Sequence, residues 1–78
     1  SNTLLNIYPN PSSDGTFMLS STNQISILNV IDIQGREVAF EETLSQNTLT
    51  LNLAKAPKGI YYLLVEIDGT LISKKLVK

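Results

Sequence analysis

The chain has 78 residues, of which 42% are hydrophobic and 17% charged, and its formal net charge is -1. This length fits one small domain with a thin core, and the composition is that of a folded protein. Without a basic excess the chain does not suit nucleic-acid binding, and without cysteine it has neither disulfide bonds nor thiolate metal sites.

The first strand is predicted over residues 4–8, with Leu5 and Ile7 facing inward. Pro9-Asn10-Pro11 ends it, because proline donates no hydrogen bond to a strand ladder. Turn residues at 12–15 lead into a second strand over residues 15–19.

Residues 25–31 are apolar at nearly every position, which predicts a central strand covered on both faces. The segment 32–35 begins with Asp and ends with Gly, the preferences of a type I turn. A fourth strand is predicted over residues 36–40, with two inward side chains and Glu37 outward. The inward pair is Val38 and Phe40. Residues 41–46 are interpreted as a connector.

The clearest alternation covers residues 48–53, where leucines and polar residues take turns. We expect one face of this strand to meet the core and the other to meet water. The inward side chains are Leu49, Leu51 and Leu53. Residues 54–59 then form a loop that is closed by Pro57 and Gly59.

The last two predicted strands, residues 60–67 and 70–77, are joined by Asp68-Gly69, the preferred pair for a two-residue type I′ turn. Such a turn pairs Leu63 with Lys74, which puts a lysine on an inward face. Two alternatives avoid burying this lysine: a bulge that shifts the register of the hairpin, or a location of the lysine at the end of the sheet. Seven short strands with hairpin connections predict an all-β fold, a seven-stranded antiparallel β-sandwich of immunoglobulin-like form.

Catalytic equipment is missing from the sequence. There is no histidine or cysteine, and the serines cluster in turns, so nucleophilic catalysis lacks its usual base and its best nucleophile. Glu41 and Glu42 are adjacent and would point to opposite faces of a strand. Asp14, Asp32 and Asp68 each stand alone in a separate turn, so no metal site is expected. We therefore predict no enzyme activity, no cofactor and no small-molecule substrate.

Two features could bind a partner. Tyr62 alternates with Tyr61 and is the best candidate for an exposed ring, although packing against the other hairpin strand is the favoured explanation. The closing run Lys74-Lys75-Leu76-Val77-Lys78 concentrates positive charge. It fits either an edge strand kept soluble by lysine or a recognition tail.

Four segments, in this order, resemble the motifs of type A C-terminal sorting domains of the type IX, or Por, secretion system. The first is Tyr8-Pro9-Asn10-Pro11, and the second is Asp32 followed by Gly35-Arg36. The third is Leu51-Asn52-Leu53 followed by Pro57-Lys58-Gly59-Ile60-Tyr61, which ends in Gly-any-Tyr, and the fourth is the basic ending from Ser73 to Lys78. The resemblance covers the chain from about Leu4 to Lys78.

The resemblance implies that a separate signal brings the cargo protein into the periplasm and that the outer-membrane type IX translocon recognises the folded domain. A sortase-like peptidase usually then removes the domain, and the cargo is anchored to lipopolysaccharide or released. The family occurs in Bacteroidetes. Lys74 to Lys78 are our hypothesis for the contact with the translocon. We expect a monomer, with an edge-strand dimer as the alternative.

The ends of the sequence carry further expectations. No secretory signal and no transmembrane-length apolar run is present. Residues 1–3 are interpreted as a tag remnant or linker end and residues 4–78 as the sorting domain, with cleavage upstream of Leu4. The alternative functions are a structural or adhesive spacer like those of immunoglobulin or fibronectin domains, and a carbohydrate-binding module. The position of the basic motif at Lys78, the last residue, favours the sorting domain.

Overall fold

The computed structural model describes residues 5–46 and 48–78, so the expected tag remnant at residues 1–3 and Leu4 lie outside the described residues. Within these ranges the chain forms seven β-strands and no helix, and hence no helix that could cross a membrane. The strands are β1 (Asn6–Tyr8), β2 (Thr16–Ser20), β3 (Ile25–Asp32), β4 (Glu41–Ser45), β5 (Thr48–Asn52), β6 (Ile60–Ile67) and β7 (Thr70–Val77).

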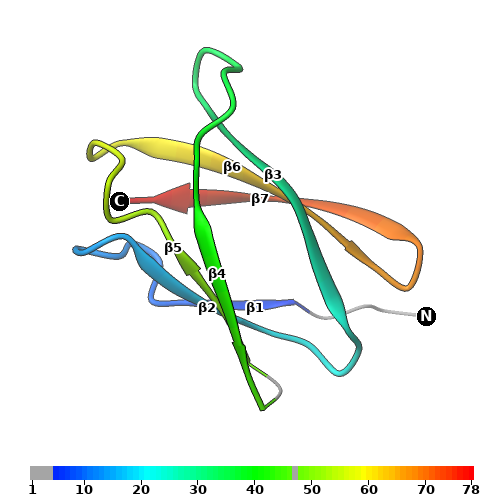
Figure 1. Cartoon of the computed structure of the whole chain (residues 1–78). Helices are drawn as coiled ribbons and strands as arrows, with labels where there is room; N and C mark the ends of the chain where they lie inside the picture. Colours follow the sequence, from blue (N-terminus) through cyan, green and yellow to red (C-terminus); the bar gives the residue numbers. More distant parts are fainter. Residues whose placement is uncertain (1–4, 47) are drawn as a thin grey trace.

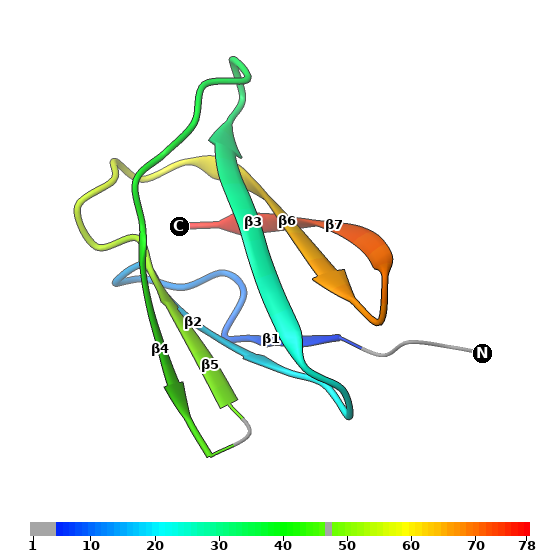
Figure 2. The same ribbon diagram turned by 45° about the vertical axis from the view of Figure 1, so that its right-hand side comes forward.

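The strands form two antiparallel sheets that pack face to face (Figure 1 and Figure 2). One sheet has the order β1-β2-β5-β4 and the other the order β3-β6-β7. When the strands are lettered along the chain, these are the A-B-E-D and C-F-G sheets of the constant-type immunoglobulin domain. The predicted immunoglobulin-like sandwich is thus confirmed.

The core lies between the inner faces of the sheets. Alternation along β5 buries Leu49 and Leu51, which pair across the ladder with Leu19 and Phe17 of β2. The central strand β6 supplies the opposite wall. Its inward residues are Tyr61, Leu63, Val65 and Ile67, which are at most 5% exposed. The predicted alternation in these strands is confirmed, and it supplies most of the apolar burial that stabilises the domain.

The prediction of a strand over residues 36–40 was wrong. This segment makes a single bridge, between Glu37 and Ile31, and the chain then crosses from the three-stranded sheet to the four-stranded one. The strand that completes the sandwich is β4, in the segment predicted as a connector. Val38 and Phe40 do pack against the core and Glu37 is exposed, as expected.

The expectation that residues 25–31 form a central strand was also wrong, because β3 is an edge strand of its sheet. A bulge shifts its register between Ile27 and Asn29. Residues three apart in a regular strand point to opposite faces, but because of the bulge Ile27 and Val30 both face the core. Leu28 is exposed. The continuous apolar pattern reflects this change of face and not burial on two sides.

The last hairpin has the register of an exact two-residue turn, which settles a choice that the sequence left open. Asp68 and Gly69 both have positive φ, 53° and 76°, and Leu63 pairs with Lys74. The lysine side chain is exposed because β7 is an edge strand.

Leu51→Ala should lower the free energy of unfolding by about 2–5 kcal/mol, because Leu51 is fully buried and its removal leaves a cavity. The matched control is Leu44→Ala in the neighbouring strand β4, where the side chain is 69% exposed and the change should be within about 0.5 kcal/mol. Urea unfolding measures both. Equal effects would contradict the assignment of β4 to the margin of the sandwich.

Candidate functional site

The first motif fastens the start of the chain to the last strand. Both Tyr8-Pro9 and Asn10-Pro11 are cis peptides. The Asn10 side chain donates a hydrogen bond to the Lys75 carbonyl (2.9 Å) and accepts one from the Val77 amide (3.0 Å). The amide of Ser12 donates to the Val77 carbonyl at 2.9 Å. Asn10 and Ser12 thus satisfy backbone groups along part of the β7 edge, as an eighth strand would.

The turn that follows the first motif is closed by side chains. The Ser12 hydroxyl is buried and lies 3.0 Å from the Asp14 carboxylate, which also accepts a hydrogen bond from the Thr16 amide. The bond from the Thr16 amide, followed by that from Ser12, lowers the pKa of Asp14 below its usual 3.8. Gly15 has φ of 84°, and a Cβ atom there would lie 2.9 Å from the Leu53 carbonyl and from Cε of Lys78.

The second motif is a hairpin held by its own aspartate. The Gly35 amide donates to the Asp32 carbonyl at 3.0 Å, which closes the predicted type I turn, and Gly35 has φ of 83°. The Asp32 carboxylate accepts bonds from the amides of Gln34 and Arg36 and pairs with Nε of Arg36 at 3.1 Å. These donors, the Arg36 amide first, lower the pKa of Asp32 below its usual 3.8.

The third motif anchors the loop between β5 and β6. The hydroxyl of Tyr61, near the start of β6, donates to the carbonyl of Pro57, four residues upstream. This is the tyrosine corner of immunoglobulin-like domains, in the equivalent strand. Gly59 exchanges two backbone hydrogen bonds with Lys78, of 2.9 and 3.0 Å, so the loop also continues the β6–β7 ladder.

The fourth motif is divided between the core, the loop and the surface. Leu76 is fully buried. The ammonium group of Lys78 donates to the carbonyls of Leu53 and Ala54, both at 2.9 Å, and to that of Ala56. Lys78 therefore closes the fold and is not the free cation that the recognition-tail hypothesis assumed. Val77 is half-buried, while Lys74 and Lys75 are exposed.

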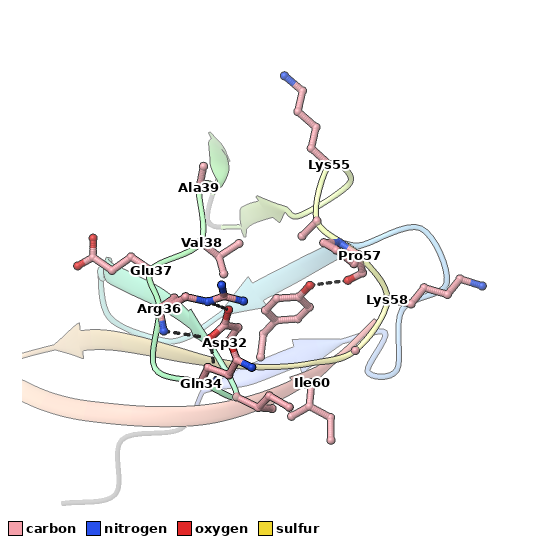
Figure 3. Close-up of a pocket in the computed structure, with 14 residues that line it drawn as sticks. Asp32, Gln34, Arg36, Glu37, Val38, Ala39, Lys55, Pro57, Lys58 and Ile60 are labelled. Atoms are coloured by element: carbon pink, nitrogen blue, oxygen red, sulfur yellow. Dashed lines mark hydrogen bonds and ion pairs between the residues drawn. The ribbon is translucent and has the colours of Figure 1, made fainter.

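The motifs therefore meet at one end of the sandwich, where Figure 1 and Figure 2 place the end of β7 beside the loop before β6. A cleft of about 520 Å³ opens there between the second and third motifs, and four of the predicted family positions line it (Figure 3). They are Asp32, Arg36, Gly59 and Tyr61. Gly35 lies at the adjoining turn, and Tyr8, Pro9, Asn10 and Pro11 lie outside the cleft lining.

Lys55 and Lys58 also line this cleft, and neither was predicted to be a site residue, although Lys58 lies within the third motif. Both side chains are exposed and point outward in Figure 3. Their spacing of three in a loop gave no signal in the sequence, because a loop has no fixed periodicity. Among the described residues no three metal-binding side chains come together.

The fold and this end of the molecule define a small immunoglobulin-like module held together by four sequence motifs. The family model of the secretion system C-terminal sorting domain matches residues 6–78. The chain belongs to that family, and it is a C-terminal sorting signal of type IX secretion. No curated protein matches the chain.

Membership has direct consequences for function. A type IX sorting signal implies export across the outer membrane to the cell surface or beyond, and interaction with the type IX secretion machinery. The family also suggests a role without catalysis.

Lys78→Met retains the aliphatic stem but removes the ammonium group from three carbonyls, so we expect the free energy of unfolding to fall by about 1–3 kcal/mol. Lys74→Met removes the same charge from an exposed position and should change it by less than about 0.5 kcal/mol. Chemical denaturation compares the two. A Lys78→Met variant as stable as Lys74→Met would show that the ammonium group does not stabilise the loop.

Acid should weaken the second motif in a way that depends on Asp32. Its pKa is lower in the folded state, so its stabilising contribution is complete above the usual value of 3.8 and is lost as the pH falls through the folded value. Wild type should therefore be more stable than Asp32→Asn near neutrality, and the difference should shrink between about pH 5 and pH 2. Thermal melting across this range measures it, and a constant difference would contradict the carboxylate's role.

Proposed function

We propose that this domain is recognised in the periplasm by the outer-membrane type IX translocon and directs a covalently attached cargo protein to the cell surface or the medium. The family match over residues 6–78 is the observation that carries the proposal. The domain acts as a sorting signal and as a substrate of the export machinery, and it catalyses no reaction of its own. Its host belongs to the Bacteroidetes.

After export, a sortase-like peptidase removes the domain, and the cargo is joined to lipopolysaccharide or released. The position of β1 supports a cut upstream of Leu4, because the first strand begins at Asn6. Cleavage there would separate cargo from signal without removing a strand from the sandwich.

Within the fourth motif, the contact with the translocon is assigned to Lys74 and Lys75 and not to the whole segment. Both are exposed on β7, whereas Leu76 and Lys78 are engaged in the fold. The domain acts as a monomer. Strand β4, exposed along its whole length at the margin of its sheet, is the edge at which the alternative dimer would form.

Export of a reporter tests the proposal. The domain is fused to the C-terminus of a periplasm-directed fluorescent protein in a bacterium with a type IX system, and fluorescence outside the cell is measured. We expect export that is lost in a translocon-deficient strain. A charge-reversed Lys74→Glu/Lys75→Glu fusion should be exported less, because the exposed cations are replaced by anions.

Retention of an intact, folded fusion in the periplasm would contradict the proposal. In that host it would favour the structural spacer, because a spacer carries no signal for crossing the outer membrane.

A further inference from the structure

The two outer faces of the sandwich differ in chemistry. Cross-strand partners line up in rows that run across each sheet. In the four-stranded sheet, the row through Thr50 contains Tyr8, Met18 and Thr43, and strand β5 presents further polar residues to solvent. The corresponding row of the three-stranded sheet contains Ile31, Tyr62 and Lys75. Cross-strand partners share a face, so the exposed ring of Tyr62 places the row on the outside.

The rows beside Tyr62 extend the apolar surface. Ile60 pairs with Val77 towards the C-terminal end of the hairpin, and Ile60 is 37% exposed. On the other side, the half-buried Leu64 is the apolar residue of a row in which it pairs with Asn29 and Ser73. The outer β6–β7 face is thus formed by Ile31, Ile60, Tyr62, Leu64, Lys75 and Val77.

We propose that the outer β6–β7 face is the surface through which the sorting domain docks on a protein of the export machinery, an inference that rests on the proposed function. The partner presents apolar side chains to Tyr62 and Ile60 and a carboxylate to Lys75. A tyrosine set among aliphatic side chains is the composition of an interface centre, where a few residues supply most of the binding energy.

Charge on and around this face selects an acidic partner. Lys75 lies beside Tyr62 in the register, and beyond Ile60 the cleft adds Lys55 and Lys58. The cleft also carries Glu37 and Arg36, and the Arg36 guanidinium is paired with Asp32. Glu66, on the outward side of β6, pairs with Leu71 at the opposite end of the hairpin. The three lysines therefore leave a positive excess at the end where the four motifs meet, and a partner with carboxylates there is steered to it.

Recognition by side chains is favoured over strand addition at this end of β7. Backbone groups of Lys75 and Val77 along the strand edge already bond to Asn10 and Ser12. A partner strand would have to displace these bonds before it could pair. The outward side chains of the hairpin remain accessible, as the exposure of Tyr62 and Lys75 indicates.

The neighbours of Tyr62 also argue for a protein partner over a glycan or a membrane. Tyr62 lies between Ile31 and Lys75 in its own row, and the next row contains Asn29, Leu64 and Ser73. An aromatic ring in such a mixed apolar and polar surface is typical of a protein interface. Binding to an anionic lipid surface draws on a cluster of basic residues, and this face carries Lys75 as its cation.

The test uses the reporter fusion with three single variants. Tyr62→Ser should reduce translocon-dependent export by about tenfold or more, because it removes the central ring of the interface. Tyr62→Phe should retain most export. Met18→Ser, which removes an apolar side chain of similar exposure (37% against 38%) from the opposite face, should export like wild type. Thermal melting of each purified domain verifies that all are folded.

The outcomes separate the two proposals. If the wild-type fusion is not exported, the proposed function fails and this inference fails with it. If wild type is exported and folded Tyr62→Ser is exported equally well, the docking face is wrong while the sorting function stands. Binding of the purified domain to lipopolysaccharide or phosphatidylglycerol vesicles, abolished by Tyr62→Ser, would also overturn the protein partner.

Discussion

The end of strand β7 is held by contacts from three distant segments, and the arrangement of the sandwich depends on them. Asn10 and Ser12 form hydrogen bonds with backbone groups at its edge, and Gly59 extends its pairing with β6. The ammonium group of Lys78 donates hydrogen bonds to carbonyls of the loop before β6. The Gly59–Lys78 bonds extend the β6–β7 hairpin, whereas the contacts of Asn10, Ser12 and the Lys78 ammonium group join segments of the two sheets and so form only when the sheets have assembled. The four motifs are therefore parts of one structural unit.

This constraint changes how the basic ending relates to sorting. A detachable tail would present all of its lysines to a receptor, but here Leu76 lies in the core and Lys78 bonds the loop. Motif residues such as Asn10, Asp32 and Tyr61 likewise use their polar groups internally. In our account, the motifs maintain the shape of the domain, and the machinery contacts the outward side chains that this shape displays.

Sequence reasoning succeeded where the signal was local. The alternation in β5 and the Asp68-Gly69 turn predicted the correct strands and faces because each depends on neighbouring residues, whereas the register of the last hairpin stayed open until the structure fixed it. Sequence reasoning failed at β4, whose wholly exposed and mostly polar residues carry no apolar pattern. It also failed at β3, where a bulge made an edge strand look doubly buried.

The motif residues of the site were identified from resemblance, but their bonds were not. The side-chain contacts of Asn10 and Lys78 join residues far apart in sequence, and no periodicity encodes such contacts. The most direct test of the account fuses the reporter to residues 60–78 alone and compares its export with that of residues 5–78. The short fusion keeps both hairpin strands and the basic ending but lacks the opposite sheet, and an isolated hairpin is only marginally stable. We predict export of the whole sandwich and none of the hairpin, whereas equal export would show that the signal is linear and contradict the account.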